Sequence, residues 1–443
     1  MRILSDYVSS EPSLPPASVA AFCAQTTPYL PEADTEAAFV VAMADITRWH
    51  QQRSPWYRAF LAASGIDPAQ LRTLQDVMAL PPIHANFFKT HEVLSIPESE
   101  ISTHLTSSGT TGQKSQMFFD DFTLGSARRM VDDVMAARGM VSTTPANYVI
   151  NGYEPFDGQK IGTANTNQFL MRYAPPAKVF WSLRALGPGQ HEFDAFGVLA
   201  ALADYANDSV PTRIAGFPAF LHFALQRMAQ SGMAPLKLPP GSAIIFGGGW
   251  KGHADKAISR EQLQRDITHW LGIPSEQIVE TFGSVEHSIP YTGCHQQHLH
   301  ALMWSRVVVR DVRTLEPLPD GQPGFLSFLS PYITSVPAHS VVMGDLAVRH
   351  PAGRAVLSTQ RPNQKWGARA VAVGVVDAFM GFLDLSAWAL LGLGRFSSAA
   401  RGQTPPQRSF CCWRCQRAPA PQTTAWADHS CNCPPGGAPP NRP

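Results

Sequence analysis

Apolar side chains recur at helical spacing in the first part of the chain and form short runs farther on. The clearest helical repeat covers residues 36–63, where Trp49 and Trp56 are the expected core anchors. The breaker Pro81-Pro82 ends this region. The pattern predicts a mostly helical N-terminal region of the large domain, residues 1–90.

Short apolar runs alternate with helical stretches beyond residue 146. The expected strands are 147–151, 212–215, 242–246 and 277–282; the expected helices are 192–206, 218–230 and 259–270. A capping box of Ser259 and Gln262 opens the last helix. This alternation predicts α/β layers with parallel strand pairing. From residue 306 the period becomes two, over 306–310, 324–329 and 340–348, which predicts a terminal antiparallel sheet.

Charge and cysteine content restrict the class of protein. The 443 residues hold 35 basic and 34 acidic side chains, so no global basic field indicates a nucleic acid or an anionic membrane as partner. Cys23 and Cys294 are the only cysteines before residue 411, which argues against a disulfide-built secreted protein. The first residues lack a secretory signal pattern. We expect a cytoplasmic globular protein.

Composition changes sharply near residue 351. Residues 1–350 have a net charge of −6 and residues 351–443 a net charge of +7, and no glutamate follows Glu316. The second segment is rich in Pro, Arg and Cys. We therefore divide the chain into the N-terminal region (1–90), a core region (91–350) and a low-complexity tail (351–443).

Three interpretations of this tail compete. Cys412 and Cys415 followed by Cys431 and Cys433 suggest a zinc module, although the second pair lacks the usual spacing. The apolar stretch 370–394 suggests a membrane anchor, but Asp377 and Asp384 would each cost about 2.5–3.5 kcal/mol at a helix centre. The favoured interpretation is a disordered or out-of-frame ending, because Arg, Pro and Cys without Glu or Lys are typical of a GC-rich gene translated in another frame.

The strongest candidate for chemistry is a hydroxyl- and glycine-rich segment. It consists of Thr106, Ser107, Ser108, Gly109, Thr110, Thr111 and Gly112, and it lies between Leu105 and residues 117–119, which look like strand ends. Glycines let backbone N–H groups converge on phosphate oxygens, and hydroxyls add donors. The spacing is not that of a Walker A loop. A flexible linker is the alternative.

This segment resembles the phosphate loop of the adenylate-forming superfamily. Three more blocks follow in the matching order: Gly247-Gly248-Gly249-Trp250-Lys251 after a strand, Glu280-Thr281-Phe282-Gly283-Ser284-Val285-Glu286-His287, and Gly344-Asp345-Leu346. Within the superfamily the chain is most similar to LuxE-type acyl-protein synthetases of bacterial bioluminescence. The residues that favour this branch include Phe87-Phe88-Lys89.

The resemblance implies an α/β large domain with parallel sheets flanked by helices and a terminal antiparallel sheet. The superfamily's small C-terminal domain is expected to be missing or disordered here. The implied chemistry is attack of a carboxylate on ATP, followed by transfer of the acyl group to a thiol. Expected cofactors are ATP and Mg²⁺, and the expected partners are a fatty acid and an acyl-accepting protein of a reductase complex, with no membrane span.

The resemblance also assigns roles to residues. Thr106–Gly112 would hold the β- and γ-phosphates, Gly247–Gly249 and Glu280–Gly283 the nucleotide, and Asp345 the ribose. Glu286 would bind magnesium, and Lys251, Glu286 and His287 are the expected catalytic residues. The superfamily's loop ends in Gly-x-Pro-Lys, whereas this one reads Gly112-Gln113-Lys114-Ser115. Lys251 could replace the missing charge, or be an ordinary surface lysine.

A second cluster contains Cys294, His295, His298 and His300. Cys294, His298 and His300 could bind zinc, but the spacing is irregular, and histidines lining a pocket or a wet loop are the alternative. An acyl pocket around Phe156, Phe217 and Phe220 has core packing as its alternative.

Three functions therefore remain open. The first is ATP-dependent acyl-protein synthesis with a long-chain fatty acid, the second a CoA ligase of the phenylacetate type, and the third a non-catalytic remnant.

Overall fold

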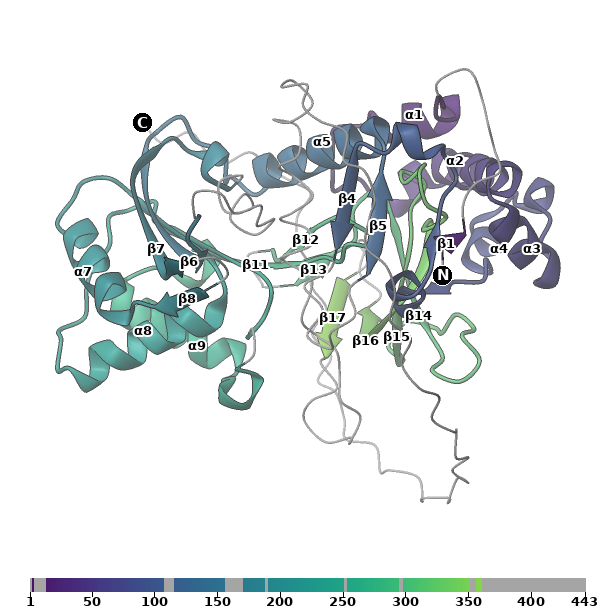
Figure 1. Ribbon diagram of the computed structural model, residues 1–443. Coiled ribbons are helices and arrows are strands. Elements are labelled where there is room, and N and C mark those ends of the chain that lie inside the picture. The colour runs from purple at the N-terminus through teal and green to yellow at the C-terminus, as the bar shows by residue number, and fades with distance from the viewer. Residues whose placement is uncertain are drawn as a thin grey trace, which may run out of the picture.

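The computed structural model describes residues 2–3, 13–106, 115–155, 170–187, 190–250, 253–294, 298–350 and 356–360. Two large sheets lie side by side, with α7, α8 and α9 beside one and the N-terminal helices beside the other (Figure 1). The described α-helices are α1 (Ala17–Cys23), α2 (Glu32–Arg53), α3 (Pro55–Ala63), α4 (Leu74–Met78), α5 (Asp121–Ala137), α7 (Ala195–Ala206), α8 (Pro218–Gln230) and α9 (Arg260–Leu271).

The seven-stranded sheet has the order β12-β11-β10-β9-β6-β7-β8. Its strands are β6 (Ala146–Tyr153), β7 (Pro176–Gly187), β8 (Gln190–Phe193), β9 (Thr212–Gly216), β10 (Ala243–Phe246), β11 (Ile278–Phe282) and β12 (Tyr291–Thr292). The strands β11, β10, β9, β6 and β7 are parallel, and β12 and β8 are antiparallel strands at the two edges. The predicted parallel α/β layer is thus confirmed.

Apolar strand faces account for this layer. Val149, Ile214 and Ile244 are fully buried and belong to one hydrophobic cluster with Leu202 of α7 and Leu221 of α8. The opposite face of the same strands joins the main core. Because both faces are covered, β10 appears in the sequence as a continuous apolar run rather than an alternating one.

The second sheet has the order β13-β17-β16-β15-β14, and β2 pairs with β16. The strands are β2 (Ile83–His84), β13 (Leu299–His300), β14 (Arg306–Arg310), β15 (Pro323–Leu329), β16 (Ser340–His350) and β17 (Val356–Gln360). The predicted antiparallel ladder β14-β15-β16 is confirmed. However, β17 pairs with β16 along residues 346–350, so the sheet continues past the boundary expected at residue 350.

Smaller strands complete the described fold. The two-stranded pairs are β1 (Arg2–Ile3) with β3 (Glu92–Val93) and β4 (Thr103–Thr106) with β5 (Gln116–Phe119). The β4–β5 pair is antiparallel, with Thr106 opposite Gln116. The expectation that strand ends flank the hydroxyl- and glycine-rich segment is therefore confirmed.

Three local expectations differ from the structure. The helical repeat expected over residues 36–63 spans two helices, α2 and α3, because Pro55 begins a new helix. The Ser54 side chain caps this helix by accepting a hydrogen bond from Tyr57 N. Glu192 and Phe193 belong to β8, because Asp194 caps α7 and the helix begins at Ala195, three residues later than expected. In α9, Ser259 accepts the hydrogen bond from Gln262 N, but the Gln262 side chain bonds Asp266, so the capping box is half formed.

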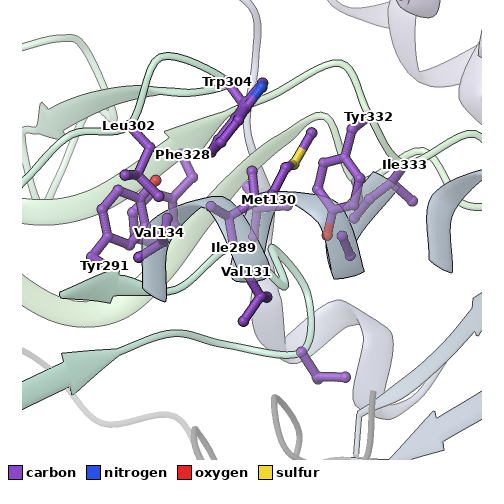
Figure 2. Packing of buried hydrophobic residues seen from close by; sticks show 14 of the residues in the cluster. Met130, Val131, Val134, Ile289, Tyr291, Leu302, Trp304, Phe328, Tyr332 and Ile333 are labelled. Carbon is purple, nitrogen blue, oxygen red and sulfur yellow. The ribbon is translucent and has the colours of Figure 1, made fainter. Parts of the chain in front are cut away.

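The main core joins the two sheets through α5. Met130, Val131 and Val134 of α5 pack near Tyr291 and Phe328, all of them buried (Figure 2). Trp49 is buried as expected, whereas Trp56 is half-buried and stacks on Phe60 and Phe87. This packing fixes the segment after β11, which carries candidate site residues.

No helix in the part of the chain described above is long and apolar enough to cross a membrane. The candidate anchor 370–394 and the tail cysteines lie outside the described residues.

Candidate active site

Two of the predicted blocks meet at the carboxyl end of the parallel sheet. The strands β9, β10 and β11 end there at Gly216, Phe246 and Phe282. Gly247 N donates to Gly216 O at 3.1 Å, and Thr281 Oγ1 donates to Phe246 O at 2.9 Å. Ligands of open α/β sheets bind at this end of the strands. The backbone thus brings the glycine turn and the segment 280–283 together where a ligand is expected.

The turn after β10 depends on glycine. Gly248 and Gly249 have φ values of 73° and 62°, a left-handed conformation that side chains disfavour. Both residues are half-buried and present bare backbone beside Trp250. A flat heterocycle could lie on such a surface. Lys251 lies outside the described residues, so its role stays a prediction.

Glu280 is engaged elsewhere. Its Oε2 lies 3.0 Å from an amino nitrogen of Arg260, and both side chains are about one-third exposed. Arg260 is the first residue of α9, beside the sheet. The Glu280 carboxylate therefore has a cationic partner within the chain, and its neighbour Thr281 is occupied by the bond to Phe246.

The hydroxyl- and glycine-rich segment is anchored by the β4–β5 pair. Of its residues, Thr106 ends β4. Ser107, Ser108, Gly109, Thr110, Thr111 and Gly112 lie outside the described residues, and their contacts stay predictions. The segment leaves β4 at Thr106 and returns at Ser115, which is fully buried.

Ser115 connects this segment to Glu286. Its Oγ donates to Glu286 Oε1 at 2.5 Å, and the Glu286 side chain is 5% exposed. Burial raises the pKa of Glu286, while hydrogen bonds from Ser115 and Ser284 and the charge of Lys89 act in the opposite direction. A buried carboxylate is costly unless hydrogen bonds or a cation stabilise it. This site therefore suits a hard cation such as Mg²⁺.

Asp345 lies inside strand β16. The β15–β16 register is irregular there, because Phe325 pairs with Leu346 while Ser327 pairs with Val342. Asp345 is half-buried inside this irregular stretch. Bulges of this kind commonly redirect a side chain beside a functional site.

Met343 links the Asp345 segment to the segment before Glu286. Ser284 Oγ lies 3.8 Å from Met343 Sδ, and Met343 is two residues before Asp345. Glu286 is likewise two residues after Ser284. The structure thus brings Ser115, Glu286 and the Asp345 segment to one region, although 230 positions separate Ser115 from Asp345.

His287 lies in the core rather than in an open site. Its ring stacks on Phe328 with centroids 4.3 Å apart, and its Nε2 hydrogen-bonds Tyr291 Oη at 2.8 Å. Burial lowers its pKa to about 3, so the imidazole stays neutral. Tyr332 Oη donates to the His287 backbone oxygen. These contacts show that His287 fixes the segment that carries Glu286, and its catalytic role stays a prediction.

The Cys294–His300 cluster does not form a metal site in the described residues. No group of three or more His, Cys, Asp or Glu side chains that could hold a metal is found there. Cys294 N instead donates to His298 O, and both Cys294 and His300 are buried. His295 lies outside the described residues.

One polar residue at the sheet end was not predicted as a candidate. Asn151 of β6 is fully buried opposite Gly216 of β9, and neither of its side-chain amide atoms hydrogen-bonds within the described structure. Strand β6 lies between β7 and β9, so the chain continues from β6 to one side of the sheet and later returns on the other side. Ligands of open α/β sheets commonly bind at such a position. The signal was present in the sequence as an asparagine ending an apolar run.

These features define an adenylate-forming ligase fold. The structure is similar to a 2-hydroxyisobutyryl-CoA ligase solved with 2-HIB-AMP, with a TM-score of 0.56 and 17% identity; the similarity covers 81% of this chain and 74% of that one. Residues 22–363 match the acyl-protein synthetase LuxE family, and the chain belongs to that family.

Curated relatives are ligases as well. The long-chain-fatty-acid–luciferin-component ligase of Vibrio harveyi is 24% identical over 295 residues, which cover 66% of this chain and 75% of the relative. The phenylacetate–coenzyme A ligase of Thermus thermophilus is 23% identical, over 67% of this chain and 61% of the relative. The predicted family is thus confirmed, and the family match extends beyond residue 350.

Proposed function

We propose that this protein activates a carboxylic acid with ATP and transfers the acyl group to a thiol. A substrate carboxylate oxygen attacks the α-phosphorus, the bond to the β-phosphate breaks, and pyrophosphate leaves with the electron pair. The thiol sulfur then attacks the acyl carbon and AMP leaves. The Ser115–Glu286 hydrogen bond carries this proposal, because it joins the end of the candidate phosphate segment to a buried carboxylate beside the parallel sheet.

ATP and magnesium have candidate binding residues among the described and the predicted parts of the site. Gly248 and Gly249 would receive the base, Asp345 the ribose hydroxyls, and the Thr106–Gly112 segment the phosphates through backbone donors. Glu286 would hold Mg²⁺, which when bound neutralises charge on the phosphate oxygens. Lys251 remains a proposed additional cation, and Lys251→Met should slow adenylation at least tenfold if it acts on the phosphates.

For the acid, we propose a long-chain fatty acid, and for the acceptor a protein thiol in a cytoplasmic reductase complex. The name of the Vibrio harveyi relative supports the fatty acid. Aromatic rings also lie close together at the carboxyl edge of the sheet. The ring centroids of Phe217 and Phe220 are 6.1 Å apart, and those of Phe193 and Phe220 are 5.1 Å apart. Such rings suit an apolar chain.

Aromatic rings at this edge of the sheet also favour a second candidate, an aryl–CoA ligase. The ring planes of Tyr153 and Phe217 make an angle of 70°, and those of Phe223 and His253 an angle of 90°. These are edge-to-face contacts, and the ring of an aryl substrate could make contacts of the same kind. The relative from Thermus thermophilus, a phenylacetate–coenzyme A ligase by name, adds support for this alternative.

Pyrophosphate release by the purified full chain tests the proposal. Mg-ATP is offered with fatty acids of increasing length, phenylacetate and benzoate, and CoA or a thiol-bearing protein is then added. A preference for long chains with transfer to a protein supports the first function, and a preference for aryl acids with transfer to CoA supports the second. No ATP binding and no pyrophosphate with any acid would overturn both and leave a non-catalytic remnant.

A further inference from the structure

We propose that Lys89 supplies positive charge to the phosphate chain of bound ATP, where this chain has Ser115 in place of the superfamily's loop lysine. The inference rests on the proposed function. It deepens that function by assigning a phosphate-binding residue outside the hydroxyl- and glycine-rich segment.

The position of Lys89 in the fold is the first argument. Lys89 ends the short 3₁₀ helix η2 (Ala85–Lys89), which packs against both β5 and β16. The preceding strand β2 pairs with β16, placing Ile83 opposite Val341. The strand β5 begins just after Ser115, and β16 carries Asp345. Lys89 therefore sits where the two strands that frame the candidate nucleotide site come together.

The backbone at Lys89 is firmly held. Phe88 is fully buried. The Phe87 ring stacks on Trp56 at 4.5 Å and on His91 at 4.3 Å between centroids. Aromatic packing on both preceding residues restricts where the lysine side chain can reach, and such preorganisation favours a binding residue.

The charge of Lys89 is the second argument. Lys89 is half-buried, and its ammonium has no hydrogen-bond or ion-pair partner within the described structure. Its charge acts on the carboxylate of Glu286, which is buried and bonded to Ser115 at the end of the hydroxyl- and glycine-rich segment. A half-buried cation close to a buried carboxylate, with no anion bonded to it, can receive an anionic ligand.

The other described lysines are placed differently. Lys178 is paired with Asp204 and Asp208, Lys256 lies over the Phe223 ring, and Lys237 is exposed on a loop. Among the described lysines, Lys89 alone acts electrostatically on Glu286. The chemistry needs such a cation, because negative charge grows on the leaving pyrophosphate as its bond to the α-phosphorus breaks. Lys89 would transfer no proton in this step.

Nucleotide binding by full-length variants tests the proposal. Affinities for Mg-ATP and for AMP are measured by calorimetry on wild type, Lys89→Met, Lys89→Arg and the control Lys237→Met. If the Lys89 ammonium acts on the β- and γ-phosphates, Lys89→Met should bind ATP about 10- to 100-fold more weakly than wild type. Its affinity for AMP, which lacks these phosphates, should stay within about twofold. Lys89→Arg should recover part of the ATP affinity. Raising ionic strength should weaken ATP binding more in wild type than in Lys89→Met.

Each other outcome is decisive. Equal ATP affinity for wild type and Lys89→Met overturns the proposal and leaves the proposed function standing. An equal loss of ATP and AMP affinity with a lowered melting temperature assigns Lys89 a structural role and overturns it too. If wild type binds no ATP, the proposed function itself fails. Should Lys89→Met not fold, Lys89→Gln replaces it, and the same comparison of ATP with AMP applies.

Discussion

The hydroxyl of Ser115 donates to the carboxylate of Glu286 across 171 positions of sequence, and both side chains are buried. This bond joins the strand after the candidate phosphate segment to the segment after β11. Its loss would leave a buried carboxylate oxygen short of a donor, which commonly costs about 1–3 kcal/mol.

Ser115→Ala should therefore lower the free energy of unfolding by about 1–3 kcal/mol, measured by urea denaturation at pH 7. The matched control is Ser99→Ala, because Ser99 is exposed and its change should stay within about 0.5 kcal/mol. Equal stability of wild type and Ser115→Ala would show that the bond does not stabilise the fold.

Asp345→Asn should weaken binding of ATP and AMP by a similar factor, about tenfold, because both nucleotides share the ribose that Asp345 is proposed to hold. This pattern differs from the one expected for Lys89→Met, which spares AMP. Calorimetry on both variants separates the two roles, with the exposed Asp255→Asn as control. A selective loss of ATP binding in Asp345→Asn would contradict the ribose assignment.

A stacked histidine pair should make stability depend on pH. The ring centroids of His50 and His339 are 4.9 Å apart, the ring planes make an angle of 12°, and both side chains are fully buried. Burial lowers the pKa of His339 from 6.5 to about 3 and lowers the pKa of His50 well below 6.5; each of His339 and Arg53 adds to the His50 shift. Protons therefore bind the unfolded chain in preference to the folded one below pH 6.5.

The free energy of unfolding should consequently fall as pH drops from about 6.5 toward 3, by up to about 1.4 kcal/mol per pH unit for each ring. Urea denaturation between pH 8 and pH 5 measures this slope. His339→Gln should remove the part of the slope that His339 contributes and leave the parts from His50 and from the buried His287. The exposed His269→Gln should leave the slope unchanged. An unchanged slope in His339→Gln would argue against the buried neutral imidazole.

Gly216→Ala should disrupt the carboxyl edge of the sheet. Gly216 has φ of 113°, and a Cβ there would lie 2.3 Å from Asn151 O. We expect a loss of about 3 kcal/mol or more and weakened nucleotide binding. Gly65→Ala is the control, since Gly65 also has positive φ but open space around it, and should cost about 1–2 kcal/mol. Similar losses in both variants would exclude the steric cause.

Local signals in the sequence were enough for several elements. The helix α8 has the predicted bounds because Pro218 starts it and apolar residues such as Leu221 and Leu225 follow at helical spacing. The strands β9 and β11 were found within one residue, because each contains adjacent apolar residues and lies close to a proline or a glycine. These features depend on neighbours in sequence.

Long-range contacts set the features that were missed. The ion pair of Glu280 with Arg260 was not foreseen, because it requires α9 to lie beside β11. His287 stands in a polar block, yet Phe328 and Tyr291 enclose it only after the two sheets pack together. The proximity of Lys89 to Glu286 likewise arises from the pairing of β2 with β16. No pattern within a short window contains this information.

Strand β17 pairs with β16 and so keeps the backbone of β16 from pairing with other chains. The strand β17 covers β16 from Leu346 to His350, just after Asp345. A chain cut before β17 would expose an unpaired row of backbone donors and acceptors on β16, and such open margins recruit strands from other copies. We would expect that shortened chain to aggregate.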